Sequence, residues 1–100
     1  MTGSMRSSDG LSARRRKLLF RSWHRGMREV DLILGSFADA EIGDLTEGEI
    51  DQYESLLDIP DTTLLPWLTG EADIPPAEET AILRRIMAFR HTMSFQNRRA

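Results

Sequence analysis

The sequence predicts an all-α fold, a compact five-helix antiparallel bundle. Apolar residues recur three or four positions apart along most of the chain, which is the spacing of a helix that buries one face. Alternation of apolar and polar residues, the pattern of a half-buried strand, does not extend over a useful length. Glycines and prolines divide the helical pattern into five segments with short connections. A length of 100 residues suits one domain with a modest core.

The first two segments meet at a glycine. The first predicted helix begins at Ser12, a suitable N-cap, and continues to His24. Gly26 is expected to end it, because glycine adopts the left-handed conformation of a helix end at least cost. The second helix begins near Met27 and stops before Gly43. Its apolar residues follow the i, i+3, i+4, i+7 spacing: Val30, Ile33, Leu34 and Phe37.

The third segment has the clearest beginning. Thr46 and Glu49 have the spacing of a capping box, in which each side chain accepts from the backbone of the other residue. Leu45 and Ile50 occupy the hydrophobic positions that flank such a box. Pro60 is expected to close this helix.

The last two segments contain prolines. We expect the fourth helix to begin at Thr63, because this start puts Pro66 in the first turn, where its missing N–H costs little. Gly70 is expected to end it. The last helix is expected to begin with Pro76 at its first position and to continue to about Met93.

The domain is expected to span residues 13–93, between a disordered N-terminal tail over residues 1–12 and a frayed C-terminal tail over residues 94–100. No apolar run approaches the roughly 20 residues that cross a bilayer, so no membrane partner is expected. The chain has no cysteine, which excludes disulfides and thiol nucleophiles and suits a reducing compartment. We expect a bacterial cytoplasmic protein. The serine- and arginine-rich start faintly resembles a mitochondrial transit peptide, which makes the mitochondrial matrix the alternative.

Charge is segregated along the chain. Residues 1–28 carry eight basic residues and one acid, residues 29–79 carry fifteen acids and no lysine or arginine, and residues 80–100 carry five arginines and no acid. The fold either places the basic outer segments beside the acidic middle or presents faces of opposite sign to partners.

The sequence offers no constellation for catalysis. Its two histidines, His24 and His91, have no partner at metal-ligand spacing, and the phosphate-binding and nucleophile motifs are missing. We therefore predict no catalytic, metal-binding or tightly cofactor-binding residues, and a function carried by a surface.

A basic cluster in the first helix is one candidate surface. It contains Trp23 and four basic side chains, Arg15, Arg16, Lys17 and Arg21. It could bind nucleic acid, but we favour a solvated helix face whose long basic side chains cover apolar surface. A net charge of −3 also makes a nucleic-acid partner a secondary expectation.

The second candidate surface is the turn "RGMRE", residues 25–29. Helix ends alone explain its composition, because Arg25 complements the end of one helix dipole and Glu29 the beginning of the next. However, R-G-x-x-E is also the signature of a known family, the small flavinylation factors of succinate dehydrogenase. The chain resembles this family over residues 14–90, which include Phe37, the segment "YESLLDIPD" of residues 53–61, and the pair Trp67 and Leu68.

The resemblance implies a five-helix bundle that is an assembly factor and not an enzyme. Members bind the flavoprotein subunit of succinate dehydrogenase or, in some bacteria, of fumarate reductase, and promote covalent attachment of FAD to it. FAD is thus handled through the partner. The R-G-x-x-E turn meets the flavoprotein, which makes these the implied partner-binding residues: Arg25, Gly26 and Glu29, the variable Met27 and Arg28 between them, and Asp31 after them. Pro66 departs from the polar residue usual before the tryptophan and puts the local helix geometry in question.

The residues alone leave other functions open. A small helical regulator, such as a nucleic-acid-binding module or the antidote of a toxin pair, would use the basic first helix. A purely structural helical subunit would associate with a partner without affecting flavin.

Overall fold

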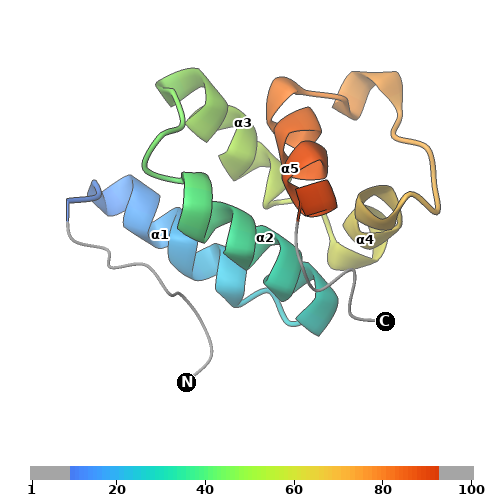
Figure 1. Cartoon of the computed structure of the whole chain (residues 1–100), viewed down its shortest axis with the longest axis horizontal. Helices are drawn as coiled ribbons and strands as arrows, with labels where there is room; N and C mark the ends of the chain where they lie inside the picture. The colour runs from blue at the N-terminus through green and yellow to red at the C-terminus, as the bar shows by residue number, and fades with distance from the viewer. Residues whose placement is uncertain (1–9, 93–100) are drawn as a thin grey trace.

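The computed structural model describes residues 10–92, and all the regular structure among them is helical (Figure 1). Met93 and the expected C-terminal tail lie outside these residues, as do residues 1–9 of the expected N-terminal tail. Within the described range Leu11 packs against the core and Ser12 caps the first helix. The elements are α1 (Ala13–Trp23), α2 (Arg28–Glu41), α3 (Glu47–Leu56), α4 (Asp61–Thr69), the 3₁₀ turn η1 (Pro76–Glu78) and α5 (Ala81–Thr92).

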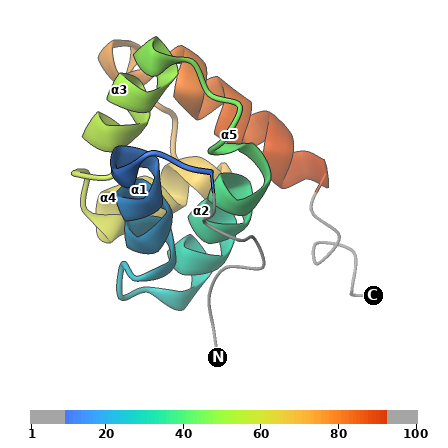
Figure 2. The same ribbon diagram turned by 90° about the vertical axis from the view of Figure 1, so that its left-hand side faces the viewer.

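The prediction of an all-α globule with five helices is confirmed. Helices α1 and α2 lie side by side, while α3 and α5 pack together across the core from them (Figures 1 and 2). Helix α2 is central, since it contacts α1, α4 and α5. Within residues 10–92, no helix combines the length and apolar character needed to cross a bilayer.

Local capping signals in the sequence set the starts of α1 and α3. The Ser12 hydroxyl accepts from the Arg15 N–H at 3.2 Å, as expected for an N-cap. The capping box is complete, because Thr46 Oγ1 accepts from the Glu49 N–H at 3.1 Å and Glu49 Oε1 accepts from the Thr46 N–H at 2.9 Å. This bond to the Thr46 N–H, and the nearby Arg85 guanidinium, lower the pKa of the Glu49 carboxyl.

The expected start of α4 at Thr63 is wrong, because the helix begins at Asp61 with Pro60 as its N-cap. The Thr63 and Leu64 N–H groups both donate to the Pro60 carbonyl, at 3.0 and 2.9 Å. Pro66 therefore lies inside the helix, where it removes the N–H that would donate to Thr62. Thr62 is exposed, so water can reach its carbonyl and limit this cost. Gly70 ends the helix with φ of +86°, as predicted.

The expected start of the last helix at Pro76 is also wrong. Pro76 opens only the short turn η1, and α5 begins at Ala81. Thr80 caps it, because its hydroxyl accepts from the Leu83 N–H at 3.2 Å. The Ile82 N–H, which also lacks a partner within the helix, donates to the side-chain oxygen of Gln52 in α3 at 3.1 Å. The beginning of α5 is thus fixed partly by a distant helix.

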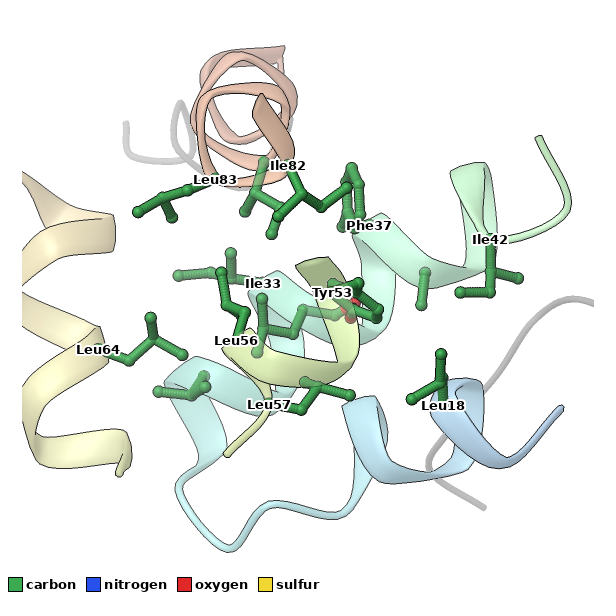
Figure 3. Packing of buried hydrophobic residues seen from close by; sticks show 14 of the residues in the cluster. Leu18, Ile33, Phe37, Ile42, Tyr53, Leu56, Leu57, Leu64, Ile82 and Leu83 are labelled. Carbon is green, nitrogen blue, oxygen red and sulfur yellow. The ribbon is translucent and has the colours of Figure 1, made fainter. Parts of the chain in front are cut away.

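The core lies between the two helix pairs and receives side chains from all five helices (Figure 3). Leu18 of α1, Phe37 of α2, Tyr53 of α3, Leu64 of α4 and Ile82 of α5 are each at most 1% exposed. Burial of such apolar surface is the main force that holds the helices together.

Opposite charges join the helices on the outside, and this confirms that the basic outer segments lie beside the acidic middle. From α1, Arg14 contacts Asp51 at 2.8 Å and Glu54 at 2.6 Å on α3. From α5, Arg85 contacts Glu41 at 2.5 Å and Glu49 at 3.0 Å. The side chains of these pairs remain 23–70% exposed, so water screens them and each pair contributes little stability by itself.

Helices α1 and α2 approach closely at Gly35. A Cβ atom at this position would overlap the indole ring of Trp23. The Trp23 Nε1 donates to Asp39 on the same helix as Gly35, at 3.3 Å. Glycine at position 35 therefore provides the space in which the indole lies.

A buried polar pair links α1 to α3. The Ser22 hydroxyl donates to the Leu18 carbonyl at 2.8 Å and lies 2.5 Å from the Tyr53 hydroxyl, which in turn donates to the Leu34 carbonyl at 3.4 Å. Tyr53 is fully buried, and this burial raises the pKa of its phenol above the ordinary value.

Substitution of Gly35 by alanine should destabilise the fold by about 1–3 kcal/mol, because the added methyl group overpacks the contact with Trp23. Urea unfolding measures this change. The control is Gly48→Ala, at an exposed helical glycine whose Cβ would meet only Thr46 Oγ1 at 3.9 Å. It should be neutral or stabilising by up to about 1 kcal/mol. Equal stability of the two variants would contradict the close approach.

Tyr53 is the only tyrosine, so its ionisation can be followed directly by phenolate absorbance. Its pKa is higher in the folded than in the unfolded chain, where it titrates near about 10. The folded state therefore binds this proton more tightly, and stability should fall as pH rises above the unfolded pKa. On alkaline titration, phenolate should appear together with loss of helical circular dichroism. Ionisation near pH 10 (about the model-peptide value) with the helices intact would show that the phenol is accessible.

Candidate functional site

The turn between α1 and α2 holds the R-G-x-x-E residues. Helix α1 ends at Trp23 with His24 as its C-cap, so Gly26 does not end the helix directly as expected but lies in the connection. Its φ is +107°, a value that favours glycine. No atom lies within 4 Å of the position that a Cβ would occupy there. The glycine thus allows the chain to reverse and leaves open space above the turn.

The side chain of Arg25 turns inward, whereas the resemblance implied a contact with a partner. It is only 10% exposed, and its Nε donates to Asp61 Oδ1 at 2.5 Å. Its two terminal nitrogens donate to the carbonyls of Leu57 at 2.6 Å and Ile59 at 2.5 Å. One guanidinium therefore binds the segment that connects α3 to α4. Figure 3 shows the end of α3 near Leu57 and the α1–α2 connection below it.

Asp31 holds the same turn from the other side. Its Oδ1, in the first turn of α2, accepts from the backbone N–H of Arg25 at 2.8 Å. Arg25 is therefore fixed through its backbone by α2 and through its side chain by residues 57–61. A turn whose first residue is held by two sets of contacts loses less conformational freedom when a partner binds.

The remaining residues of the motif differ in exposure. Gly26, Arg28 and Glu29 are exposed, and Met27 is partly buried against the core. Within residues 10–92, the Glu29 carboxylate has no hydrogen bond or ion pair. The structure therefore brings the six implied residues together on one corner, where three are open to solvent and the other three shape the turn.

A cleft of about 380 Å³ lies beside the turn. Arg25 and Asp61 line it together with Phe20 and His24, whose rings stack with centroids 3.9 Å apart. Phe20 is 62% exposed, the more exposed of the two large apolar side chains that face solvent among residues 10–92.

Sequence reasoning missed Asp61 and Phe20 as neighbours of the turn. Asp61 had only the signal of an acid after a proline, which suggests a helix cap, and it lies 36 residues from Arg25. Phe20 lies beside the face that Leu19 and Trp23 share in the first helix, and its spacing gave no indication that it would remain so exposed.

The basic cluster of α1 is largely occupied by intramolecular contacts. Arg15 donates to the Ile42 carbonyl at 2.6 Å and Arg21 pairs with Asp58 at 3.1 Å. Arg16 donates to the Leu11 carbonyl at 2.7 Å. Arg15 also pairs with Glu47 at 2.9 Å, so two of the four basic side chains, Arg15 and Arg21, have an acidic partner, which supports the solvated-face interpretation.

The described residues contain no group of three or more side chains placed to hold a metal ion. Exposed His24 lies against the Phe20 carbonyl, with Nδ1 2.7 Å from the oxygen.

Comparison with known proteins gives a consistent result. The profile of the Sdh5 family, described as flavinator of succinate dehydrogenase, matches residues 16–90. The FAD assembly factor SdhE of Acetobacter pasteurianus is 40% identical over 81 residues, which cover 81% of this chain and 74% of that protein. The mitochondrial succinate dehydrogenase assembly factor 2 of Dictyostelium discoideum is 43% identical over 72 residues, or 72% of this chain. That of Scheffersomyces stipitis is 37% identical over 71 residues, or 71% of this chain.

The chain spans about half the length of these two mitochondrial relatives, 51% and 48%. No solved structure matches it. The matched region contains the whole turn and all of α2, α3 and α4. By the extent of this match, the chain belongs to the family of succinate dehydrogenase flavinators, which are assembly factors and not catalytic enzymes.

Proposed function

We propose that the chain binds the flavoprotein subunit of succinate dehydrogenase through residues 25–29 and so promotes covalent attachment of FAD to that subunit. The observation that carries this proposal is the pairing, on one rigid turn, of an unobstructed glycine with an exposed carboxylate. Gly26 has open space at its Cβ position, and Glu29 is exposed. Because no side chain among residues 10–92 pairs with this carboxylate, it is available to a cation or N–H group of another protein.

Each residue of the turn has a separate part in this proposal. Gly26 lets the partner's backbone approach closely, and Glu29 accepts a charge-assisted hydrogen bond. Arg28 adds an exposed charge between them. The other three residues do not contact the partner but hold the turn in shape through contacts within the chain: Arg25, Met27 and Asp31.

Promotion of flavin attachment requires no reactive group on this chain. The histidine that accepts FAD and the flavin itself belong to the partner, and the chain handles the cofactor only through it. A bound factor that favours one arrangement of the partner's domains raises the fraction of time that the two groups spend in near-attack geometry. Fumarate reductase is the alternative partner. We expect the chain in the same compartment as the flavoprotein subunit, which is the cytoplasm in a bacterium or the matrix in a mitochondrion.

Substitution of Glu29 by alanine should abolish complex formation and flavin attachment. The loss of a first-turn acid should cost the fold only a few tenths to about 1 kcal/mol. Co-expression with the flavoprotein subunit, followed by in-gel fluorescence of covalent flavin, measures the effect. The control is Asp44→Ala, which removes an exposed acid beyond the other end of α2. Full flavinylation with the Glu29 variant would refute this role for the turn, and no flavin effect of the unsubstituted chain would refute the proposed function.

Two substitutions of Gly26 should separate backbone strain from obstruction of the partner. Alanine and arginine share the strain of a positive φ, expected to be about 1–2 kcal/mol, and both side chains point into open space. Only the long arginine should block the partner's approach. Thermal unfolding should therefore give similar stability for both variants, while pull-down of the flavoprotein should fail only for Gly26→Arg.

Gly70→Ala provides a control for strain alone, because Gly70 has φ of +86° and an equally open Cβ position at the end of α4. It should lose stability like Gly26→Ala and bind the partner normally. Normal binding by Gly26→Arg would contradict the close approach of the partner to this glycine.

A further inference from the structure

We propose that Asp61, at the first position of α4, is a positioning residue that holds the turn of residues 25–29 in the conformation that binds the flavoprotein subunit. This inference rests on the proposed function and deepens it. It assigns a role in partner binding to a residue that lies outside the R-G-x-x-E motif and has no need to touch the partner.

The first step is that the Arg25–Asp61 ion pair is largely shielded from water. The two side chains are 10% and 16% exposed, and their atoms lie 2.5 Å apart. The Arg14 and Arg21 pairs on the same side of the molecule are more exposed, with partners that are 46–79% exposed. A pair that is shielded from water interacts more strongly, and its loss leaves a buried charge without its counterion.

The second step is the position of the pair relative to the turn. Arg25 precedes Gly26 directly, and glycine has the widest range of backbone conformations. The bond from the Arg25 N–H to Asp31 fixes one end of the turn to α2. The side chain of Arg25 fixes the same residue to Asp61. Without the carboxylate, two carbonyl contacts remain, those to Leu57 and Ile59, and neither neutralises the guanidinium.

The third step connects conformation to affinity. If the turn spends only a fraction of its time in the binding conformation, the apparent dissociation constant rises by the inverse of that fraction. A turn that is correctly placed about one tenth of the time would bind about tenfold more weakly. Once bound, it makes the same contacts as before. Asp61 should therefore affect the concentration of chain that is needed and leave the rate at saturation unchanged.

The test uses the full chain with Asp61→Asn, which removes the charge and keeps the size of the side chain. In a flavinylation titration with purified flavoprotein subunit and FAD, the half-saturating concentration of the chain should rise about tenfold, while the maximal rate should stay the same. Hydrogen exchange should accelerate at the Arg25 amide and remain slow at core amides of α2.

Two control variants exclude simpler explanations. Asp58→Asn removes the exposed partner of Arg21, three residues before Asp61, and should leave the titration unchanged. Thr46→Ala removes the cap of α3 at a distance from the turn and lowers global stability. It should not shift the half-saturating concentration even if its melting temperature falls as far as that of Asp61→Asn.

Several results would overturn the inference. They are an unchanged half-saturating concentration for Asp61→Asn, an equal shift for Thr46→Ala at equal stability, or a fall in the maximal rate alone. Failure of the unsubstituted chain to bind or to promote flavinylation would instead refute the proposed function. In that case the exchange at the Arg25 amide still decides whether Asp61 holds the turn.

Discussion

The Arg25 guanidinium joins two connections that lie far apart in the sequence. From the α1–α2 turn it donates to Asp61 and to the carbonyls of Leu57 and Ile59, which together form the link from α3 to α4. Carbonyls at the end of a helix lack donors within that helix, and an arginine can supply several donors in a fixed geometry. The same contacts thus complete α3, fix the start of α4 and determine the shape of the turn. The exposed corner that carries Gly26 and Glu29 depends on them.

Segregated charge supports the same arrangement over the rest of the fold. Helix α1 is basic and contacts the acidic α3 through Arg14 and Arg15, at separations of 32 to 40 residues. Surface pairs of this kind contribute little stability singly, but a wrong pairing of helices would bring like charges together. The charge pattern therefore selects the helix arrangement, while the apolar core stabilises it. It also pairs Arg15 and Arg21 of the basic α1 cluster with acids, which weakens the attraction of that face for a nucleic acid.

Features governed by nearby residues could be predicted from the sequence, and those governed by distant residues could not. The caps at Ser12 and Thr46 depend on residues three positions away, so their patterns were sufficient. At the starts of α4 and α5, local bonds to the Pro60 carbonyl and the Thr80 hydroxyl are joined by contacts from Arg25 and Gln52, which lie 36 and 30 residues from their partners. Propensity alone placed Pro66 in a first turn, but the Thr63 and Leu64 N–H groups donate to the Pro60 carbonyl, so the helix begins two residues earlier than expected.

The candidate site shows the same division. The motif was recognisable as a sequence pattern, and it correctly indicated one exposed corner with Gly26 and Glu29 accessible. The pattern could not distinguish residues that face outward from residues that hold the turn, because this depends on Asp61. Arg25 is therefore best understood as part of the scaffold of the site. In this motif the turn lowers the stability of the fold only a little. The shielded ion pair beside it lowers that stability much more when it is broken. This coupling gives the fold a way to keep the small exposed surface of the turn rigid.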